Sequence, residues 1–320
     1  MIIPRYWAEG VVRHRSDGRQ VTVRRFGWSD VDPFDAQAVA DSRVAEALGR
    51  ILSGEKLAKR EPKVPYNGAD GVPIREEIVS ERGDVVITRN SYGALCLNTP
   101  DVLFADVDVE AVISPGIGCA YLLGLAVACI GLGWGTGSPA LGVWGLLVGL
   151  VGGALAAWSR IRYGDPLKRL KGRIERFLAD RPDWRIRVYR TPAGFRLLAM
   201  HRVFSPDDPE VAGLFAAVKA DPVYVRMCKR QQCFRARISP KPWRAGMKEH
   251  IRPRPGVWPV REEWMPARLA WIREYEKKAA GYASCCLECE LGLGLTDSKA
   301  RLVQGLHDEL CRAGSGLPLA

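Results

Sequence analysis

Two carboxylates at alternate positions follow an apolar segment of the chain. Asp106 and Asp108 follow Val102-Leu103-Phe104-Ala105, and Glu110 continues the alternation. Residues two apart lie on the same face of a strand, where like charges repel one another unless a cation is opposite. Mg²⁺ takes one or two carboxylates together with a substrate phosphate. The spacing therefore predicts a Mg²⁺ site at Asp106 and Asp108, an arginine network that neutralises the acids, or plain solvation. The arginines available to such a network are Arg185, Arg187 and Arg190.

Cysteine and histidine recur near the end of the chain at spacings that a metal site uses. Cys286 and Cys289 are separated by two residues, and His307 precedes Cys311 by one helical turn. Two thiolates and an imidazole are ligands that tetrahedral zinc accepts. Ordinary packing of small thiols beside helices is the alternative, and we prefer it to zinc. The count of nine cysteines is odd, which favours free thiols over a disulfide framework.

A basic region interleaved with aromatic residues follows in the second half of the chain. Stacking surfaces within positive grooves hold single-stranded nucleic acid, and the same mixture settles among lipid headgroups at a membrane interface. The whole chain carries a net charge of +11, which suits anionic partners of either kind. The members of the region are Arg226, Lys229, Arg230, Arg235, Arg237, Lys241, Arg244, Arg252 and Arg254, with Phe234, Trp243 and Trp258.

No charged side chain occurs between Glu110 and Arg160. The apolar blocks 117–134 and 140–158 each approach the roughly 20 residues that a membrane-spanning helix needs, and a Gly-Thr-Gly-Ser-Pro turn separates them. Arginines and lysines crowd the exit, which predicts cytoplasmic N- and C-termini. The sequence thus predicts a transmembrane hairpin over 112–159 in a multi-pass protein of the bacterial inner (plasma) membrane, with the lipid bilayer as a partner.

The elements on either side of this hairpin predict an α+β fold. We expect a cytoplasmic part over 1–111, a strand-and-helix part over 160–238 that completes the same domain, and a Pro/Arg/Trp-rich segment with terminal helices over 239–320. Strand 102–108, a helix, and the hairpin 185–202 follow one another in β-α-β-β order once the apolar insert is removed. The expected sheet is mixed or antiparallel and joins strands from both sides of the insert.

Two segments resemble motifs of the archaeo-eukaryotic primase-polymerase superfamily. Residues 102–108 are similar to its apolar run with Asp-x-Asp, and residues 189–198 to its second motif. The resemblance implies that Asp106 and Asp108 are metal ligands and that Arg196 stands where the family has a phosphate-contacting histidine. A third acidic motif is missing. The whole chain also resembles uncharacterised bacterial two-span membrane proteins, which implies no activity.

The function expected from these patterns is a membrane-anchored protein whose basic α+β domain binds phosphate-bearing ligands. Nucleotide or nucleic acid is the preferred ligand, with Arg196, Arg190, Arg235 and Arg237 as phosphate contacts. One alternative is a non-enzymatic membrane scaffold that holds anionic lipid headgroups. Another is a diverged metal-dependent nucleotidyltransferase of primase-like fold. Whether the chain is an enzyme is left open, because no nucleophile with a partnered base can be named.

Overall fold

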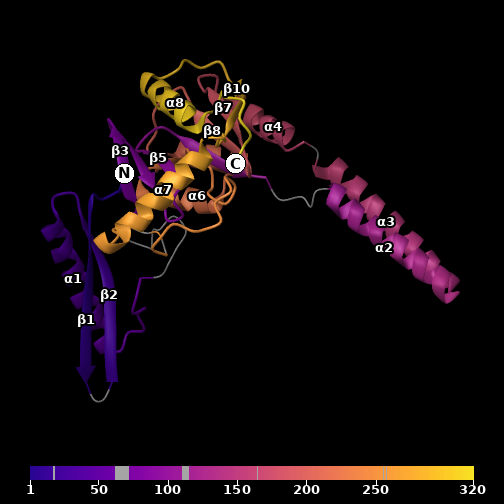
Figure 1. Ribbon diagram of the computed structural model, residues 1–320. Helices are drawn as coiled ribbons and strands as arrows, with labels where there is room; N and C mark the ends of the chain where they lie inside the picture. Colours follow the sequence, from indigo (N-terminus) through magenta and orange to yellow (C-terminus); the bar gives the residue numbers. More distant parts are fainter. Residues whose placement is uncertain (17–18, 62–71, 110–114, 164, 255, 257) are drawn as a thin grey trace. The chain divides into compact units, whose positions relative to one another are not determined.

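A computed structural model describes residues 1–16, 19–61, 72–109, 115–163, 165–254, 256 and 258–320. Ten strands and eight α-helices lie within these residues (Figure 1). The chain divides into two compact units. One unit contains Met1–Val107 and Arg181–Ala320, and the other contains Asp108–Asp180. Segments before and after the second unit therefore fold together in the first.

A two-stranded hairpin covered by one helix begins the first unit. Strands β1 (Tyr6–Ser16) and β2 (Arg19–Ser29) pair antiparallel, and α1 (Pro33–Leu52) starts at the N-cap Asp32. The helix lies directly on two glycines of the hairpin. A Cβ on Gly27 would come within 2.2 Å of the Ala36 carbonyl oxygen, and one on Gly10 within 2.7 Å of the Ala40 carbonyl oxygen. Only glycine permits this approach of helix to strand.

One four-stranded sheet of the first unit has the order β3-β4-β5-β9, and each pair is antiparallel. Its last strand comes from more than 130 residues further along the chain than its neighbour β5. Every residue of β4 is buried, so this sheet forms part of the core. The strands are β3 (Glu77–Arg82), β4 (Val85–Arg89), β5 (Leu95–Thr99) and β9 (Phe234–Arg237).

The second four-stranded sheet has the order β10-β7-β8-β6. Strand β6 (Phe104–Asp108) therefore lies beside β8 (Gly194–Ala199), which pairs with β7 (Ile186–Thr191) and then with β10 (Cys286–Leu291). The prediction that 102–108 shares a sheet with the hairpin 185–202 is confirmed. Strand β10 was not expected, because the cysteines of this segment were expected only to pack beside helices.

Three further helices of the first unit begin with a proline or serine that directly follows a side-chain-capping aspartate. An aspartate before the first turn accepts backbone N–H groups that have no partner inside the helix, and proline at the first position lacks one such donor. The three are α5 (Pro209–Val218), α6 (Pro222–Gln231) and α8 (Ser298–Cys311). A short 3₁₀ turn, Glu262–Trp264, leads into α7 (Met265–Ala279).

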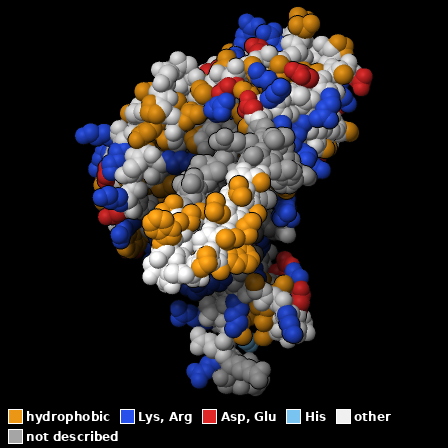
Figure 2. Space-filling model, turned by 90° about the vertical axis from the view of Figure 1, so that its right-hand side faces the viewer, with side chains coloured by type: hydrophobic (Ala, Val, Ile, Leu, Met, Phe, Trp, Pro, Cys, Tyr) orange, Lys and Arg blue, Asp and Glu red, His pale blue; other side chains and the backbone are white. Residues whose placement is uncertain are grey.

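The second unit contains the helical hairpin α2 (Pro115–Thr136) and α3 (Pro139–Tyr163), followed by α4 (Pro166–Leu178). Hydrophobic side chains are exposed on the hairpin (Figure 2), including Trp134 at 90 % and Trp144 at 65 % of their surface. Crossing a bilayer requires about 20 consecutive apolar residues in one helix. Among the residues that the structure describes, no helix has the length and apolar character for a span. The predicted transmembrane hairpin over 112–159 is therefore wrong, as is the multi-pass inner-membrane location inferred from it. The lipid bilayer as a partner stays a prediction.

Candidate metal centre

Helix α8 carries two of the three side chains that meet at the candidate site. Its N-cap Asp297 accepts hydrogen bonds from the backbone of Lys299 at 2.8 Å and Ala300 at 2.9 Å. The helix then buries a single face, formed by Ala300, Val303, His307 and Cys311. Residues four apart lie one above the other on a helix. His307 and Cys311 therefore point into the core together.

The third side chain, Cys285, is held beside this helix by backbone hydrogen bonds. Ser284 N–H donates to the Cys311 carbonyl at 2.9 Å, which ties the segment before β10 to the last turn of α8. The C-terminal tail adds a second tie, because Ala283 N–H donates to the Pro318 carbonyl at 3.0 Å and Ala320 N–H donates to the Ala283 carbonyl at 3.1 Å. These ties place Cys285 opposite His307.

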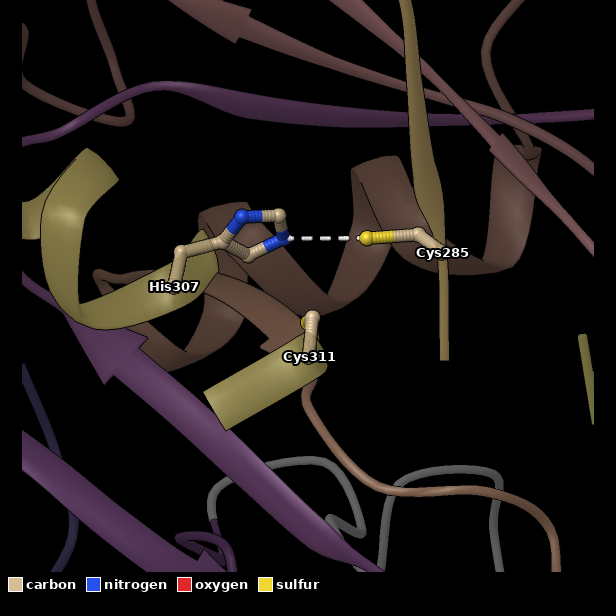
Figure 3. Close-up of side chains that lie close together, drawn as sticks. All are labelled: Cys285, His307 and Cys311. Carbon is tan, nitrogen blue, oxygen red and sulfur yellow. Dashed lines mark hydrogen bonds between the residues drawn. The ribbon is translucent and has the colours of Figure 1, made fainter. Parts of the chain in front are cut away.

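Cys285, His307 and Cys311 bring two thiol groups and one imidazole to a single point (Figure 3). Their ligand atoms all lie within 4.8 Å of one another, and the distance from Cys285 Sγ to His307 Nε2 is 3.9 Å. All three side chains are buried, with at most 1 % of any residue exposed. Zinc–sulfur bonds of about 2.3 Å and zinc–nitrogen bonds of about 2.0–2.1 Å place tetrahedral ligands nearly this close together.

The other ring nitrogen of His307 contacts a carboxylate. His307 Nδ1 lies 2.9 Å from Asp308 Oδ1, and Arg187 Nη2 lies 3.4 Å from the second oxygen of that carboxylate. A carboxylate at Nδ1 favours the tautomer that carries its proton there, which turns the Nε2 lone pair towards Cys285. The rings of Tyr189 and Phe104 flank the imidazole at centroid distances of 4.8 Å and 5.3 Å. His307 is therefore fixed in position and orientation.

The pKa values of the two thiols of the centre shift in opposite directions. A hydrogen bond from Cys311 is the main reason why the pKa of Cys285 falls from 9.0 to about 5, and contact with His307 and the charge of Arg196 also lower it, against the effect of burial. Burial, and then the neighbouring Cys285, raise the pKa of Cys311 well above its ordinary value. Burial opposes protonation of His307, but its contacts with Asp308 and Cys285 raise its pKa overall. The contacts of Cys285 therefore favour its thiolate form, whereas those of Cys311 favour the thiol.

Arg196 connects the centre to the carboxylate that the sequence singled out. Its Nε donates to Asp106 Oδ1 at 3.0 Å, its Nη1 donates to the Arg237 carbonyl at 2.8 Å, and Nη1 also lies 3.4 Å from His307 Nε2. Arginine pairing of Asp106 is thus observed, with Arg196 in place of the three arginines that were expected. Asp108 is exposed on the same strand, and Glu110 lies outside the described residues. Mg²⁺ binding by Asp106 and Asp108 stays a prediction.

The other predicted phosphate contacts lie in different surroundings. Arg190 on β7 forms an ion pair with Glu288 on β10. Arg235 on β9 is buried, and its Nη2 donates to Glu76 Oε2 at 2.6 Å. Arg237, two residues later, has a partly buried side chain that contacts Tyr92. The four arginines therefore do not form one site.

The predicted ligands Cys286 and Cys289 do not belong to the candidate metal centre, which contains Cys285. Both lie on β10 with partly exposed side chains, and Cys286 pairs in register with Arg190. Cys285 lies one residue before the strand and is fully buried. The strand pairing of β10 is the signal that sequence reasoning missed. The glutamates at 288 and 290 pair across strands with Arg190 and Arg185, a pattern that indicates a strand.

Comparisons of the chain with protein-family models, with curated proteins and with solved structures return no match. The resemblance to primase-polymerase motifs consequently stays a prediction. The function has to be inferred from the side chains of the site itself.

Proposed function

We propose that the chain binds a thiophilic transition-metal ion of the zinc class through Cys285, His307 and Cys311. The observation that carries this proposal is the convergence of the three donor atoms within 4.8 Å in a fully buried location. Soft thiolate ligands together with imidazole select zinc or copper(I) over Mg²⁺ or Ca²⁺. With three protein ligands, zinc keeps a fourth position for water or another donor.

The charges around the centre suit a dication. Thiolates at Cys285 and Cys311 neutralise two positive charges, while Arg196 is balanced by Asp106 and Arg187 by Asp308. A histidine that binds a metal usually donates its other N–H to a carboxylate, which fixes the ring and raises its basicity. Asp308 stands in that position relative to His307. The surroundings of the centre therefore support binding through His307 Nε2.

A second candidate function rests on the same contacts. Cys285, His307 and Asp308 form a thiol–imidazole–carboxylate series in which the pKa of the thiol is lowered to about 5, as in nucleophilic cysteines. The side chain of Cys285 is fully buried, however, and a nucleophile must meet its substrate. Burial restricts access to a substrate but not the retention of an ion. We therefore favour metal binding.

The proposal is tested by the metal content of the purified protein and of two neighbouring variants. Wild-type protein, exchanged against a mild chelator, should retain zinc at one ion per chain when measured by mass spectrometry. Cys285→Ser should abolish retention, since it removes a ligand of a three-ligand site. Cys286→Ser is the matched control, because Cys286 is adjacent in the chain but outside the group, and it should retain zinc like the wild type.

Two results would contradict metal binding. One is wild-type protein that contains no transition metal and whose melting temperature is unchanged by added zinc. The other is equal loss of zinc from both variants, which would place the ligands on the exposed side of β10. Rapid alkylation of Cys285 by iodoacetamide in the folded, metal-free protein would instead support the nucleophilic cysteine.

A further inference from the structure

A second cluster of polar side chains, separate from the metal centre, includes the side chain of Arg237 on β9. The backbone carbonyl of Arg237 accepts from Arg196, whereas its side chain contacts the hydroxyl of Tyr92. Tyr92 is held in the turn between β4 and β5, where Asn90 Oδ1 accepts from the backbone N–H of Tyr92 at 3.2 Å and of Ala94 at 3.1 Å. A structured turn therefore presents the phenol to the guanidinium.

Arg244 brings a second guanidinium to this cluster. It lies in a compact turn in which Arg244 N–H donates to the Lys241 carbonyl at 2.8 Å. Its Nη1 is buried and has no hydrogen-bond partner. Burial, and then the positive charge of Arg237, lower the pKa of Arg244, so the two guanidinium groups are close enough to repel one another. No carboxylate of the described residues forms an ion pair with either arginine.

A buried guanidinium nitrogen without a hydrogen-bond partner, such as Arg244 Nη1, is unfavourable because water is displaced from it without replacement. An anionic ligand between the guanidinium groups would remove this cost. Guanidinium groups bind phosphate through paired N–H donors, and a tyrosine hydroxyl adds a further donor. A phosphate group is therefore the anion that these three side chains suit.

An exposed aromatic ring stands next to the cluster. The ring of Trp243 lies 5.4 Å from that of Tyr92 in an edge-on arrangement, and Lys241 Nζ lies 5.5 Å from the Trp243 centroid. Trp243 is 53 % exposed, so part of its surface is open to a ligand. Planar bases stack on such rings.

We propose that Arg237, Arg244 and Tyr92 bind the phosphate of a nucleotide whose base stacks on Trp243. The nucleotide is either free or part of a single strand, and both present the same phosphate and base. The site does not depend on the metal, because none of its side chains is a metal ligand. It assigns the phosphate-binding role expected of this basic region to Arg237 and Arg244, and it leaves Arg235 and Arg196 with structural partners.

Calorimetric titration with adenosine monophosphate, inorganic phosphate and a short oligothymidylate tests this site. Arg244→Gln should weaken binding of all three probes by about 10- to 100-fold, the loss expected for a hydrogen bond to a charged group. Trp243→Ala should weaken binding of the nucleotide and the oligonucleotide but leave inorganic phosphate unchanged. Tighter binding of oligothymidylate than of the monophosphate, with steep salt dependence, would assign the site to single strands.

Arg273→Gln is the matched control, since Arg273 is exposed on α7 and its loss changes the net charge equally. It should leave binding of the monophosphate unchanged. The proposal is overturned if wild-type protein binds none of the probes, or if the Arg244 and Arg273 variants bind alike. Arg244→Lys keeps the charge but not the planar fork of donors, and should give an intermediate affinity. Thermal unfolding of each variant verifies that it is folded.

Discussion

Two buried arginines on adjacent parts of the core differ in what their side chains contact. Arg235 donates to Glu76 at 2.6 Å and to Asn98 at 3.1 Å, and Glu76 also accepts from Thr88 at 2.7 Å. Both members of the Arg235–Glu76 pair are at most 3 % exposed. Arg196 is equally buried, but its carboxylate partner Asp106 is 31 % exposed.

The difference separates a structural ion pair from one placed beside reactive groups. Arg235 donates to Glu76 and Asn98, two buried side chains outside the candidate metal centre. Arg196 instead extends one nitrogen to within 3.4 Å of His307 Nε2, next to the thiols. Burial and charge alone would therefore not distinguish the two arginines. What distinguishes them is that Arg196 also contacts His307.

The largest expected loss of stability is at the Arg235–Glu76 pair, in which both side chains are buried. Glu76→Gln removes the counter-charge of Arg235 and leaves a buried guanidinium without an anion, which should destabilise the protein by about 3–5 kcal/mol. Chemical denaturation measures this loss. If Glu76→Gln changed stability by only a few tenths of a kcal/mol, the network around Arg235 would not be a structural element of the core.

A smaller stability loss is expected at the Arg196–Asp106 pair, in which the carboxylate is partly exposed. Asp106→Asn should cost about 1–3 kcal/mol, the range for loss of one partner in a charged hydrogen bond, because the exposed part of residue 106 lets water compensate. The same variant should bind zinc more weakly, since Arg196 then repels a cation near His307. Equal destabilisation by Asp106→Asn and Glu76→Gln would remove the distinction between the two pairs.

The most local effect is the titration of Cys285 in metal-free protein. Its pKa is lowered to about 5, so the stability contributed by the thiolate is complete above the ordinary thiol pKa of 9.0 and is lost as the pH falls through about 5. Within this window the unfolded chain holds a proton that the folded chain has released. His307 works in the opposite direction, because its pKa is raised.

The ultraviolet absorbance of the thiolate follows this titration directly. Wild-type protein should keep the absorbance down to about pH 5, whereas Cys285→Ser should lose it at neutral pH. A thiolate absorbance that appears only near pH 9 in the wild type would show that Cys311 and His307 do not stabilise the anion.

The sequence predicted local structure better than the partners of individual side chains. Element order predicted the pairing of strand 102–108 with the hairpin after the insert. Aspartate followed by proline, a pattern visible in the sequence, marks the starts of α1, α4 and α5. The apolar composition of 112–159 was wrongly interpreted as a membrane anchor, because apolar composition alone does not determine whether a helix spans a membrane.

The candidate site was predicted in part. His307 and Cys311 were recognised from helical spacing, but Cys286 and Cys289 were chosen instead of Cys285 because the strand β10 was not foreseen. Likewise, no local pattern shows that Arg196 on β8 reaches both Asp106 on β6 and His307 on α8. Such contacts depend on tertiary packing.

Cobalt(II) substitution tests the metal centre most directly, because a thiolate bound to cobalt gives an intense charge-transfer absorption. We predict this absorption in wild-type protein and in Cys286→Ser, its loss in Cys285→Ser, and release of protons from Cys311 as the ion binds. Absence of the absorption from the wild type, or its persistence in Cys285→Ser, would contradict a metal centre built from Cys285, His307 and Cys311.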